Sequence, residues 1–582
     1  MKSLNLIKPY FRENKKSIFL GLFCLIIVDL LQLFVPRIIK ASVDGLAKSS
    51  VDLKHLAINS GLIIAIAALI GLFRYGWRFW LIGLSRRIEE GLRKKIYDHV
   101  ITFSPYDLSG MKSGDIMARA SSDISGIRMA SGMGIVALTD ALFLGIASAI
   151  FMAMLNWKLA LLTLIPLPMI AVSSRLLSRK MHKLYTDVQT TVSEITEAIR
   201  ERLSGIRIIK AFSREADETI KVRELSEKYL RKSMKRVRVT GLFIPLMIFF
   251  TNLGLVIILF AGGRMAIRGE ITAGDFAAFI SYLTLMTWPM MAMGWVVTLI
   301  QRGKASMDRI EGLLSVKPVV SEQPDSMNNF EIKGSVSFIN MGFSYGSVSG
   351  SDYFFRNFNL DIPPGTTLGI TGPPGHGKTT LLGFLPRFYD PSEGMVMIDG
   401  IDIRNLSLDL LRKNISLMPQ EPFLFSGTIR DNIKLDLEIE DSEIMNAARK
   451  AAIDTTIMEL PEGLDTRVGE KGVLLSGGQK QRVALARVFL RPAPIILLDD
   501  PISQVDAVSA SMIMESIMEF AKGKTLIIVS HRLSALKISD RIIVMENGEI
   551  TESGNHDELV ALGGYYSRIS RMQAIEEELN AL

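Results

Sequence analysis

Six long apolar segments, separated by polar and charged stretches, fill the first half of the chain. They lie at about 17–39, 57–84, 132–155, 158–177, 241–262 and 273–300. Each is near or above the ~20 residues that a helix needs to cross a hydrocarbon layer of ~30 Å. The pattern predicts a membrane α-helical bundle of six transmembrane helices, joined by two long cytoplasmic loops, within residues 1–315.

The pattern changes after Arg302, where hydropathy falls and a polar stretch with two prolines predicts a linker at 316–330. Beyond it, apolar and polar residues alternate at Ser335–Phe338 as in a half-buried strand. Short apolar runs at 367–371 and 494–498 are typical of buried strands. We therefore expect residues 331–582 to form an α/β domain.

The composition fits a membrane domain joined to a soluble one. Hydrophobic residues make up 48% of the chain and charged residues 22%, which is too apolar for a wholly soluble protein and too charged for a wholly membrane one. A single cysteine, Cys24, excludes an internal disulfide framework.

The net charge of +7 fits either nucleic-acid binding or basic cytoplasmic loops. Lysines and arginines gather near the N-terminus and in the long stretches between spans two and three and between spans four and five. The positive-inside bias places both termini and both long loops in the cytoplasm. We expect a multi-pass protein of the inner membrane, in contact with the lipid bilayer and with no nucleic-acid partner.

Four charged residues fall inside the predicted spans, namely Asp29, Arg74, Arg78 and Asp140. An unpaired charge in lipid is costly, so each is a candidate functional group. At ~1.5 Å per residue, Arg74 and Asp140 are expected at similar depth, where they would pair. A structural ion pair, or a side chain that reaches toward water, is the simpler interpretation. Contact with a substrate is the alternative.

A phosphate-binding loop follows the predicted strand at 367–371 and precedes an apolar helical pattern, which is the context that this motif requires. Its glycines let backbone N–H groups converge on phosphate oxygens. Lys378 supplies positive charge for the β- and γ-phosphates, and the Thr379 hydroxyl is placed to hold Mg²⁺. The loop contributes Gly372, Gly375, Gly377, Lys378, Thr379 and Thr380.

Two further motifs lie downstream. The run at 494–498 ends in Asp499 and Asp500, and Asp499 is expected to complete the metal site. The sequence Leu-Ser-Gly-Gly-Gln opens a predicted helix, where a serine and two glycines favour an anion site. This second motif comprises Ser476, Gly477, Gly478 and Gln479.

In this order, the phosphate loop, Gln420, the Leu-Ser-Gly-Gly-Gln motif, the paired aspartates and His531 resemble the ATP-binding cassette of ABC transporters. The resemblance covers about residues 331–575. With six preceding spans, the whole chain is similar to an exporter-type half-transporter. The resemblance implies a P-loop α/β nucleotide-binding domain, ATP and Mg²⁺ as cofactors, and ATP hydrolysis coupled to transport.

The resemblance also implies roles for single residues. Tyr345 matches the aromatic residue that stacks on adenine, and Gln420 matches the glutamine that senses the metal ion. His531 matches the switch histidine on the γ-phosphate. The motif at 476–479 would contact ATP held by the opposite chain.

Three other segments acquire roles only through the family. Asp506 matches the loop that crosses the dimer interface. Residues 103–110 and 211–217 fall where such exporters place their cytoplasmic coupling helices. Without the resemblance, both would be interpreted as ordinary helices of the loops.

One departure from the family matters. The catalytic base is normally a glutamate directly after the metal-binding aspartate, and this chain has Asp500 there. Losing one methylene withdraws the carboxylate by ~1.5 Å, which misplaces a base that must reach the attacking water. Hydrolysis at this chain's own site is expected to be slow.

The combination is similar to one half of the bacterial heterodimeric multidrug exporters of the MdlA type, with one degenerate and one competent ATP site. The expected partner is a different half-transporter that carries a glutamate after its own metal-binding aspartate. The motif at 476–479 would serve that partner's site. The alternative is a homodimer in which Asp500 acts as a weaker base.

The sequence thus predicts an ATP-driven exporter of small amphipathic, drug-like or lipid-like substrates. Two other functions stay open. One is a regulatory ATP-binding subunit that gates a partner transporter, and the other is a homodimeric exporter of peptides or siderophores.

Overall fold

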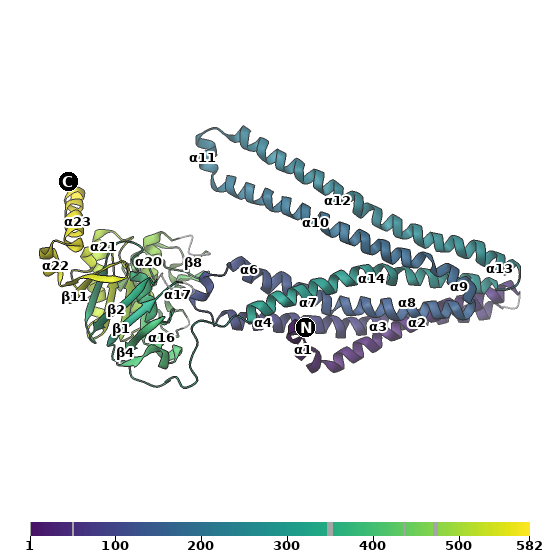
Figure 1. Cartoon of the computed structure of the whole chain (residues 1–582), viewed down its shortest axis with the longest axis horizontal. Helices are drawn as coiled ribbons and strands as arrows, with labels where there is room; N and C mark the ends of the chain where they lie inside the picture. Colours follow the sequence, from purple (N-terminus) through teal and green to yellow (C-terminus); the bar gives the residue numbers. More distant parts are fainter. Residues whose placement is uncertain (1, 49–51, 346–352, 436, 470–474, 582) are drawn as a thin grey trace. The chain divides into compact units, whose positions relative to one another are not determined.

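The structure is a computed structural model that describes residues 2–48, 52–345, 353–435, 437–469 and 475–581 (Figure 1). The chain forms two compact units. The membrane unit consists of Met1–Ile101 and Met111–Lys317, and the cassette unit of Thr102–Gly110 and Pro318–Leu582. The cassette unit therefore includes a short segment from the first half of the chain.

Six helical stretches of the described chain are long and apolar enough to cross a membrane, which confirms the predicted bundle. They are Lys15–Ala47, Leu53–Val100, Ser113–Leu155, Trp157–Ser204, Glu215–Ile267 and Ala273–Leu314. In chain order the unit contains η1 (Lys2–Leu6), α1 (Lys8–Glu13), α2 (Lys15–Ala47), α3 (Leu53–Trp77), the π-helical turn η2 (Arg78–Ile82), α4 (Gly83–Val100), α6 (Ser113–Ala118), the π-helical turn η3 (Arg119–Asp123), α7 (Ile124–Ser131), α8 (Met133–Leu155), α9 (Trp157–Leu164), α10 (Pro166–Ser204), α11 (Ile206–Ala211), α12 (Glu215–Ile257), the π-helical turn η4 (Ile258–Gly262), α13 (Gly263–Ile267) and α14 (Ala273–Leu314).

Helix α14 packs against α2, α7, α8 and α10 within the membrane unit. Its buried Phe279, Tyr282, Leu283 and Met286 recur every three or four residues, so they share one face of the helix. The Tyr282 hydroxyl donates a hydrogen bond to the carbonyl oxygen of Leu33 at 3.0 Å. The bond satisfies a polar group in apolar surroundings.

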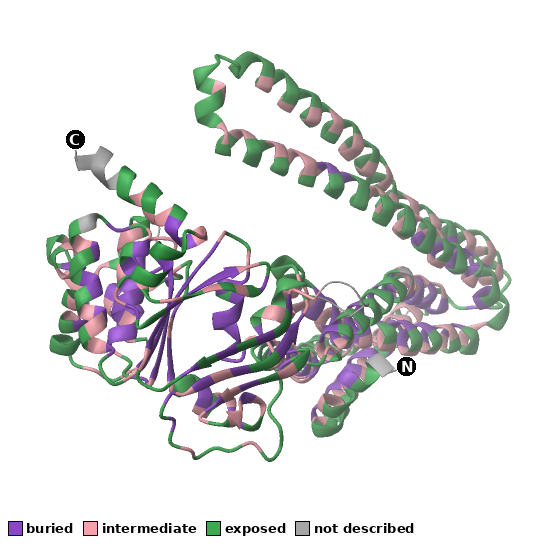
Figure 2. Cartoon of the chain, turned by 60° about the vertical axis from the view of Figure 1, so that its left-hand side comes forward, coloured by how far each residue is buried: buried purple, intermediate pink, exposed green. Residues whose placement is uncertain are grey.

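The two long stretches that the sequence places between spans are helical rather than irregular. Helices α10 and α12 continue beyond their apolar parts as a pair, joined by α11 at the far end (Figure 1). Ion pairs link the extensions, with 2.7 Å between Arg202 and Glu218 and 2.7 Å between Lys228 and Glu194. These charged extensions remain mostly exposed (Figure 2).

The cassette unit contains two larger sheets. The first has the strand order β2-β1-β4-β5 and is antiparallel, and the second has the order β12-β11-β3-β10-β9-β6 and is parallel except for β12. The unit contains α5 (Pro105–Ser109), β1 (Val336–Phe343), β2 (Phe355–Ile362), β3 (Thr367–Thr371), α15 (Lys378–Phe384), β4 (Glu393–Ile398), β5 (Ile401–Asp402), η5 (Ile403–Asn405), α16 (Leu408–Lys413), β6 (Ile415–Met418), β7 (Gly427–Thr428), α17 (Ile429–Lys434), α18 (Asp441–Lys450), α19 (Asp454–Glu459), η6 (Gly463–Asp465), β8 (Arg467–Val468), α20 (Gly477–Phe489), β9 (Ile495–Asp499), α21 (Ala507–Phe520), β10 (Thr525–Val529), η8 (Leu533–Ala535), β11 (Arg541–Glu546), β12 (Glu549–Gly554), α22 (His556–Leu562) and α23 (Tyr565–Ala581).

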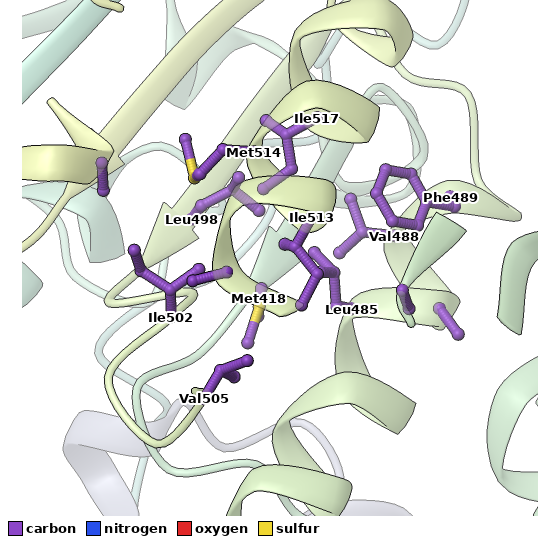
Figure 3. Packing of buried hydrophobic residues seen from close by; sticks show 14 of the residues in the cluster. Met418, Leu485, Val488, Phe489, Leu498, Ile502, Val505, Ile513, Met514 and Ile517 are labelled. Carbon is purple, nitrogen blue, oxygen red and sulfur yellow. The ribbon is translucent and has the colours of Figure 1, made fainter. Parts of the chain in front are cut away.

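The parallel sheet is buried by helices, as its continuous apolar strands require. Every residue of β3, β9 and β10 is buried. Leu498 of β9 belongs to one apolar cluster with Leu485 of α20 and Ile513 of α21 (Figure 3). This core fixes the strand ends from which the candidate site is built.

The short helix α5 belongs to the cassette unit through specific contacts. A capping box begins it, since the Ser104 hydroxyl accepts from the Asp107 N–H at 3.2 Å and the Asp107 carboxylate accepts from the Ser104 N–H at 2.9 Å. The Tyr106 ring lies edge-on to Phe343 and Tyr389, at centroid distances of 6.5 and 6.1 Å. Residues 103–110 therefore dock on the aromatic side chains of the cassette.

Candidate active site

Three loops that carry predicted site residues follow neighbouring parallel strands. Strand β10 lies between β3 and β9, so that Val529 is opposite Ile370 on one side and Asp499 on the other. Parallel strands end at the same edge of a sheet, and ligands bind at that edge in many α/β folds. The loop after β3, the turn after β9 and the segment after β10 therefore meet.

The phosphate loop has the backbone that its glycines permit. Gly372, Gly375 and Gly377 have φ of 143°, 81° and 95°, which side chains rarely tolerate. A Cβ at Gly372 would overlap the carbonyl oxygen of Met545, whereas a Cβ at Gly375 would meet nothing within 4 Å. The loop is thus tightly packed on one side and open on the other, as a backbone cradle for an anion requires.

Lys378 begins α15 and lies beneath this loop. Its Nζ donates to the carbonyl oxygens of Gly372 and Pro373 at 2.8 and 2.7 Å, and its side chain is buried. Burial lowers the pKa of Lys378, while the nearby Asp499 and Asp500 carboxylates raise it. The ammonium group therefore faces the sheet edge where the two aspartates lie.

Asp499 is the strongest metal-ligand candidate. It is 3% exposed, and burial raises its pKa to about 6, with the hydrogen bond from Thr379 and the Lys378 charge acting in the opposite direction. The charge of Lys378 and the hydrogen bond from Thr379 therefore do not offset the cost of burying a charged Asp499 carboxylate. A hydroxyl beside one carboxylate suits Mg²⁺, which proteins commonly hold through one or two carboxylates together with substrate phosphates.

Asp500 is held by its backbone and by its side chain. Its φ of 54° is left-handed, and its N–H donates to the Val529 carbonyl oxygen at 2.7 Å. Its Oδ1 accepts from the Ser530 hydroxyl at 3.0 Å, and its carbonyl oxygen accepts from the Gln481 amide at 2.6 Å. The carboxylate therefore lies against the end of β10.

His531 follows β10 and is partly buried. Burial lowers its pKa, as does the charge of Lys378, whereas Asp500 raises it. The imidazole is therefore mainly neutral at pH 7 and has one nitrogen able to accept and one able to donate. Gln573 of α23 fixes this segment, because its amide donates to the His531 carbonyl oxygen at 2.7 Å and accepts from the Leu533 N–H at 2.9 Å.

Tyr345 lies close to the phosphate loop. Its hydroxyl is 2.6 Å from the hydroxyl of Thr380, and its ring packs edge-on to Phe343 and Tyr389. The side chain is 53% exposed, which leaves part of the ring available to a base. Tyr345 and Tyr106 therefore contact the same two aromatic rings.

Gln420 is less well placed than the others. It lies two residues after β6, whose register with β9 brings it to the same edge of the sheet. The side chain is exposed and forms no hydrogen bond within the described part of the chain. The structure therefore does not bring Gln420 into contact with Thr379 or Asp499.

The motif at 476–479 starts α20. The Ser476 hydroxyl accepts from the Gln479 N–H at 3.3 Å, and the Gln479 side chain accepts from the Ser476 N–H at 2.8 Å. A Cβ at Gly477 or Gly478 would overlap atoms of Gln504. The two glycines thus allow the turn after Asp500 to lie against the helix start.

Several supporting residues carry no signal in the sequence. Ser530, Gln481 and Gln573 hold Asp500 and His531 through bonds between segments 19 to 42 residues apart. Each is a common polar residue outside the recognised motifs. The register of β9 and β10 and the docking of α23, rather than local spacing, bring them to the site.

Two family models match this chain, one over most of the membrane unit and one over part of the cassette unit. The family model described as "ABC transporter transmembrane region" matches residues 18–290, and the one described as "ABC transporter" matches residues 355–503. Both matches agree with the sequence order of a membrane domain followed by an ATP-binding cassette.

Full-length relatives share this arrangement. The chain is 34% identical to "Multidrug resistance-like ATP-binding protein MdlA" of Escherichia coli (strain K12), covering 98% of this chain and 96% of the relative. It is 33% identical to "ATP-dependent lipid A-core flippase" of Desulfotalea psychrophila, covering 98% and 100%. A solved structure, "Structure of a bacterial Atm1-family ABC exporter with ATP bound", has the same fold, with a TM-score of 0.78, 24% identity and coverage of 96% and 98%.

Proposed function

This chain belongs to the ABC transporter family as an exporter-type half-transporter that hydrolyses ATP, and we propose that it exports small amphipathic substrates as one half of a heterodimer. The substrates are drug-like or lipid-like. The partner is a different half-transporter with a glutamate after its metal-binding aspartate. Asp500 is the main support for the heterodimer, because it occupies the position at which the family has that glutamate.

The surroundings of Asp500 support slow hydrolysis at this chain's own ATP site. The carboxylate is one methylene shorter than that of a glutamate and accepts a hydrogen bond from Ser530. A general base must lie within hydrogen-bond reach of the water that it deprotonates. A short side chain held against β10 is poorly suited to that reach.

The residues around Asp500 are those that binding of MgATP needs. Bound MgATP supplies the phosphoryl group that is hydrolysed. The amides of the loop at 372–377 and the Lys378 ammonium bind phosphate, and Thr379 and Asp499 hold the metal ion. His531, mainly neutral at pH 7, is able to donate a hydrogen bond to a terminal phosphate.

Two further residues complete the proposed site. Tyr345 offers the exposed part of its ring to adenine. Gln420 is exposed and forms no hydrogen bond among the described residues, so its side chain would be free to turn toward a bound metal ion. Such a turn would link the metal site to the segment that the family uses to contact its membrane domain.

The intact motif at 476–479 serves the partner's site. Its serine caps α20, and its two glycines place no side chain of their own at the first turn of the helix. An incoming terminal phosphate therefore meets a helix N-terminus. Asp506 caps α21 and lies in the loop that would cross the interface.

Transport follows from closure of two cassettes on ATP, transmitted to the membrane domains by the coupling segments. Tyr106 of the first segment is seated on the cassette rings. In the second segment Phe212 is 72% exposed, and Ile208 of the adjoining α11 is 66% exposed. An exposed apolar tip on a charged helical pair fits docking on the partner's cassette.

The proposed location is the inner membrane with the cassette in the cytoplasm, since basic residues dominate the cytoplasmic extensions. The proposed boundaries are a membrane domain at 1–315, a linker at 316–330 and a cassette at 331–582. The segment at 102–110 lies in the sequence of the first domain and folds with the second.

Purification of the chain alone and together with a candidate partner half-transporter tests the proposal. We expect the pair to form a stable dimer with substantial ATPase activity and the chain alone to show little. A dimer of this chain alone that hydrolyses ATP at a comparable rate would contradict it. A homodimeric exporter would then be the better assignment.

A regulatory subunit is the second candidate, and the same residue, Asp500, favours it. In that case the chain binds ATP and gates its partner without catalysing hydrolysis. Substrate transport by the pair that continues after Lys378→Ala, but loses its dependence on ATP binding to this chain, would identify this function.

A further inference from the structure

A histidine within the phosphate loop is bonded to the hairpin that β11 and β12 form. His376 lies between Gly375 and Gly377 and is partly buried. Its Nδ1 accepts a hydrogen bond from the backbone N–H of Asn547 at 2.8 Å. Because Nδ1 is the acceptor, the bonded imidazole is neutral and carries its proton on Nε2. A protonated imidazole is a donor at both nitrogens and cannot form this bond.

Asn547 supplies an N–H group that its own turn does not use. Asn547 and Gly548 join Glu546 to Glu549, which are paired across β11 and β12. Their φ of 51° and 79° are both left-handed, as in the type I′ hairpin turn that favours Asn-Gly. The hydrogen bond of a β-turn joins its first and fourth residues, so the N–H of the second residue has no partner within the turn. His376 therefore provides the partner that the turn lacks.

Close contacts hold the same hairpin against the loop. A Cβ at Gly372 would overlap the carbonyl oxygen of Met545 in β11. A Cβ at Gly548 would overlap the carbonyl oxygen of Phe354, and a Cβ at Gly377 would overlap the ring of the same phenylalanine. The loop and the turn thus approach more closely than side chains at these glycines would allow, and the histidine adds a directed bond to this contact.

We propose that His376 is a positioning residue that holds the phosphate loop, through Asn547, in the form that binds phosphate. A loop that is already held in its bound conformation loses less conformational entropy when a ligand arrives. The neutral imidazole holds the loop and the protonated imidazole releases it, so the affinity of this chain for MgATP falls at low pH. The inference rests on the proposed binding of MgATP at this loop, to which it adds a dependence on pH.

Several charged groups lie on the elements around the phosphate loop. They are Glu546 and Glu549 beside the turn, Arg356 on β2, Lys378 at the start of α15, and Asp499 and His531 at the sheet edge. All of them are shared by the wild type and by His376→Asn. The Oδ1 of an asparagine takes the place of Nδ1 and accepts hydrogen bonds at every pH. Comparing these two proteins at each pH therefore isolates the imidazole.

Binding of MgATP to the full chain in nanodiscs, at pH 8 and at pH 5.5, tests the inference. His376→Leu removes the acceptor and should weaken binding by about threefold to tenfold at pH 8. His376→Asn should match the wild type at pH 8 and bind more tightly than the wild type at pH 5.5, by up to about the same factor. His182→Leu makes the same change at an exposed position of α10 and should alter neither value.

Hydrogen exchange of the Asn547 amide, followed by mass spectrometry without nucleotide, reports on the bond itself. At pH 8 the amide should exchange more slowly in the wild type and in His376→Asn than in His376→Leu. At pH 5.5 only His376→Asn should keep this protection. The inference is overturned if His376→Leu binds MgATP as tightly as the wild type at pH 8, or if the affinity ratio between the wild type and His376→Asn is the same at both pH values.

The two measurements also separate this inference from the proposed function. If MgATP binds but neither its affinity nor the exchange of the Asn547 amide depends on residue 376, the inference alone is wrong and the nucleotide site stands. If the wild type binds no MgATP at either pH, the proposed nucleotide site is wrong. The positioning role then fails with it, even where the exchange data show the bond.

Discussion

At the scale of single residues, Asp499 combines deep burial with a negative charge. Its pKa of about 6 lies well above the usual ~3.9, so the folded cassette holds a proton there that the unfolded chain releases. This stabilisation is present below pH ~4 and is lost as the pH rises through about 6. At pH 7.5 the charged carboxylate therefore destabilises the nucleotide-free cassette.

We expect Asp499→Asn to raise the free energy of unfolding at pH 7.5 by up to about 3 kcal/mol and to flatten its decrease between pH 5 and 7. Denaturant titrations of the cassette transition in the full chain, without nucleotide, measure this effect. The variant should also lose the added stability that MgATP gives. Asp506→Asn is the control. Hydrogen bonds from Ser509 lower the pKa of Asp506, so removing this carboxylate should not stabilise the cassette.

A second residue-scale prediction concerns Asp500→Glu. The added methylene extends the carboxylate toward the attacking water, and a well-placed general base contributes ~10²–10⁴-fold to rate. The left-handed backbone, with φ of 54°, costs a glutamate about 1 kcal/mol. We expect at least a several-fold rise in hydrolysis at this site, measured in a dimer whose partner has lost its own base.

Asp557→Glu provides the matched control for that experiment, since it makes the same chemical change at an exposed position in the first turn of α22. It should leave turnover unaltered. No rise with Asp500→Glu would mean that another feature, such as the partner's signature motif, limits hydrolysis.

At the scale of elements, α5 lies within the proposed coupling segment at 103–110 and contacts the aromatic rings that also surround Tyr345. Tyr106 and Tyr345 both pack on Phe343 and Tyr389. We expect Tyr106→Ala to reduce substrate-stimulated ATPase activity several-fold while the Kd for ATP is unchanged, because the variant loosens coupling without altering the phosphate loop. Measuring the stimulated and basal ATPase rates, and the Kd for ATP in a separate binding assay, tests this prediction.

Tyr106→Phe retains the ring and should behave as wild type. Equal loss in both variants would assign the effect to the hydroxyl group. A fall in ATP affinity with Tyr106→Ala would instead indicate that the ring cluster shapes the nucleotide site itself.

The elements also differ in how far the sequence predicts them. The six spans and the loop at 372–377 follow from local patterns, namely apolar length and glycine spacing next to a strand. The helical extensions of α10 and α12 occupy the stretch for which the sequence predicts a long cytoplasmic loop with a coupling helix at 211–217, because charged surfaces look alike in loops and exposed helices. The docking of α5 on the cassette depends on rings more than 200 residues away.

The candidate site shows the same division. Lys378 and Asp499 are predictable because each lies in a motif next to a recognisable strand, whereas His531 is predicted only through the family resemblance. The bonds from Ser530 to Asp500 and from Gln573 to the His531 segment depend on strand register and on a distant helix. Motifs therefore predict which residues gather, and tertiary structure decides how each is held.

At the scale of the whole molecule, a heterodimer makes the two halves of this cassette unequal. In the proposed heterodimer, the phosphate loop and Asp500 would belong to the slow site, and the motif at 476–479 would belong to the partner's active one. Changing the motif should therefore cost more activity than changing the loop. In a homodimer both changes would disable every site equally.

We expect Ser476→Ala in this chain to reduce ATPase activity of the pair by tenfold or more, and Lys378→Ala to leave a substantial part of it. Ser476 also caps α20, and losing a cap costs about 1 kcal/mol of stability. Ser407→Ala removes a similar cap from α16 and should leave activity intact. Steady-state rates of the purified pair compare the three variants. Equal losses from Ser476→Ala and Lys378→Ala would show two equivalent sites, and the unequal roles inferred from Asp500 would not hold.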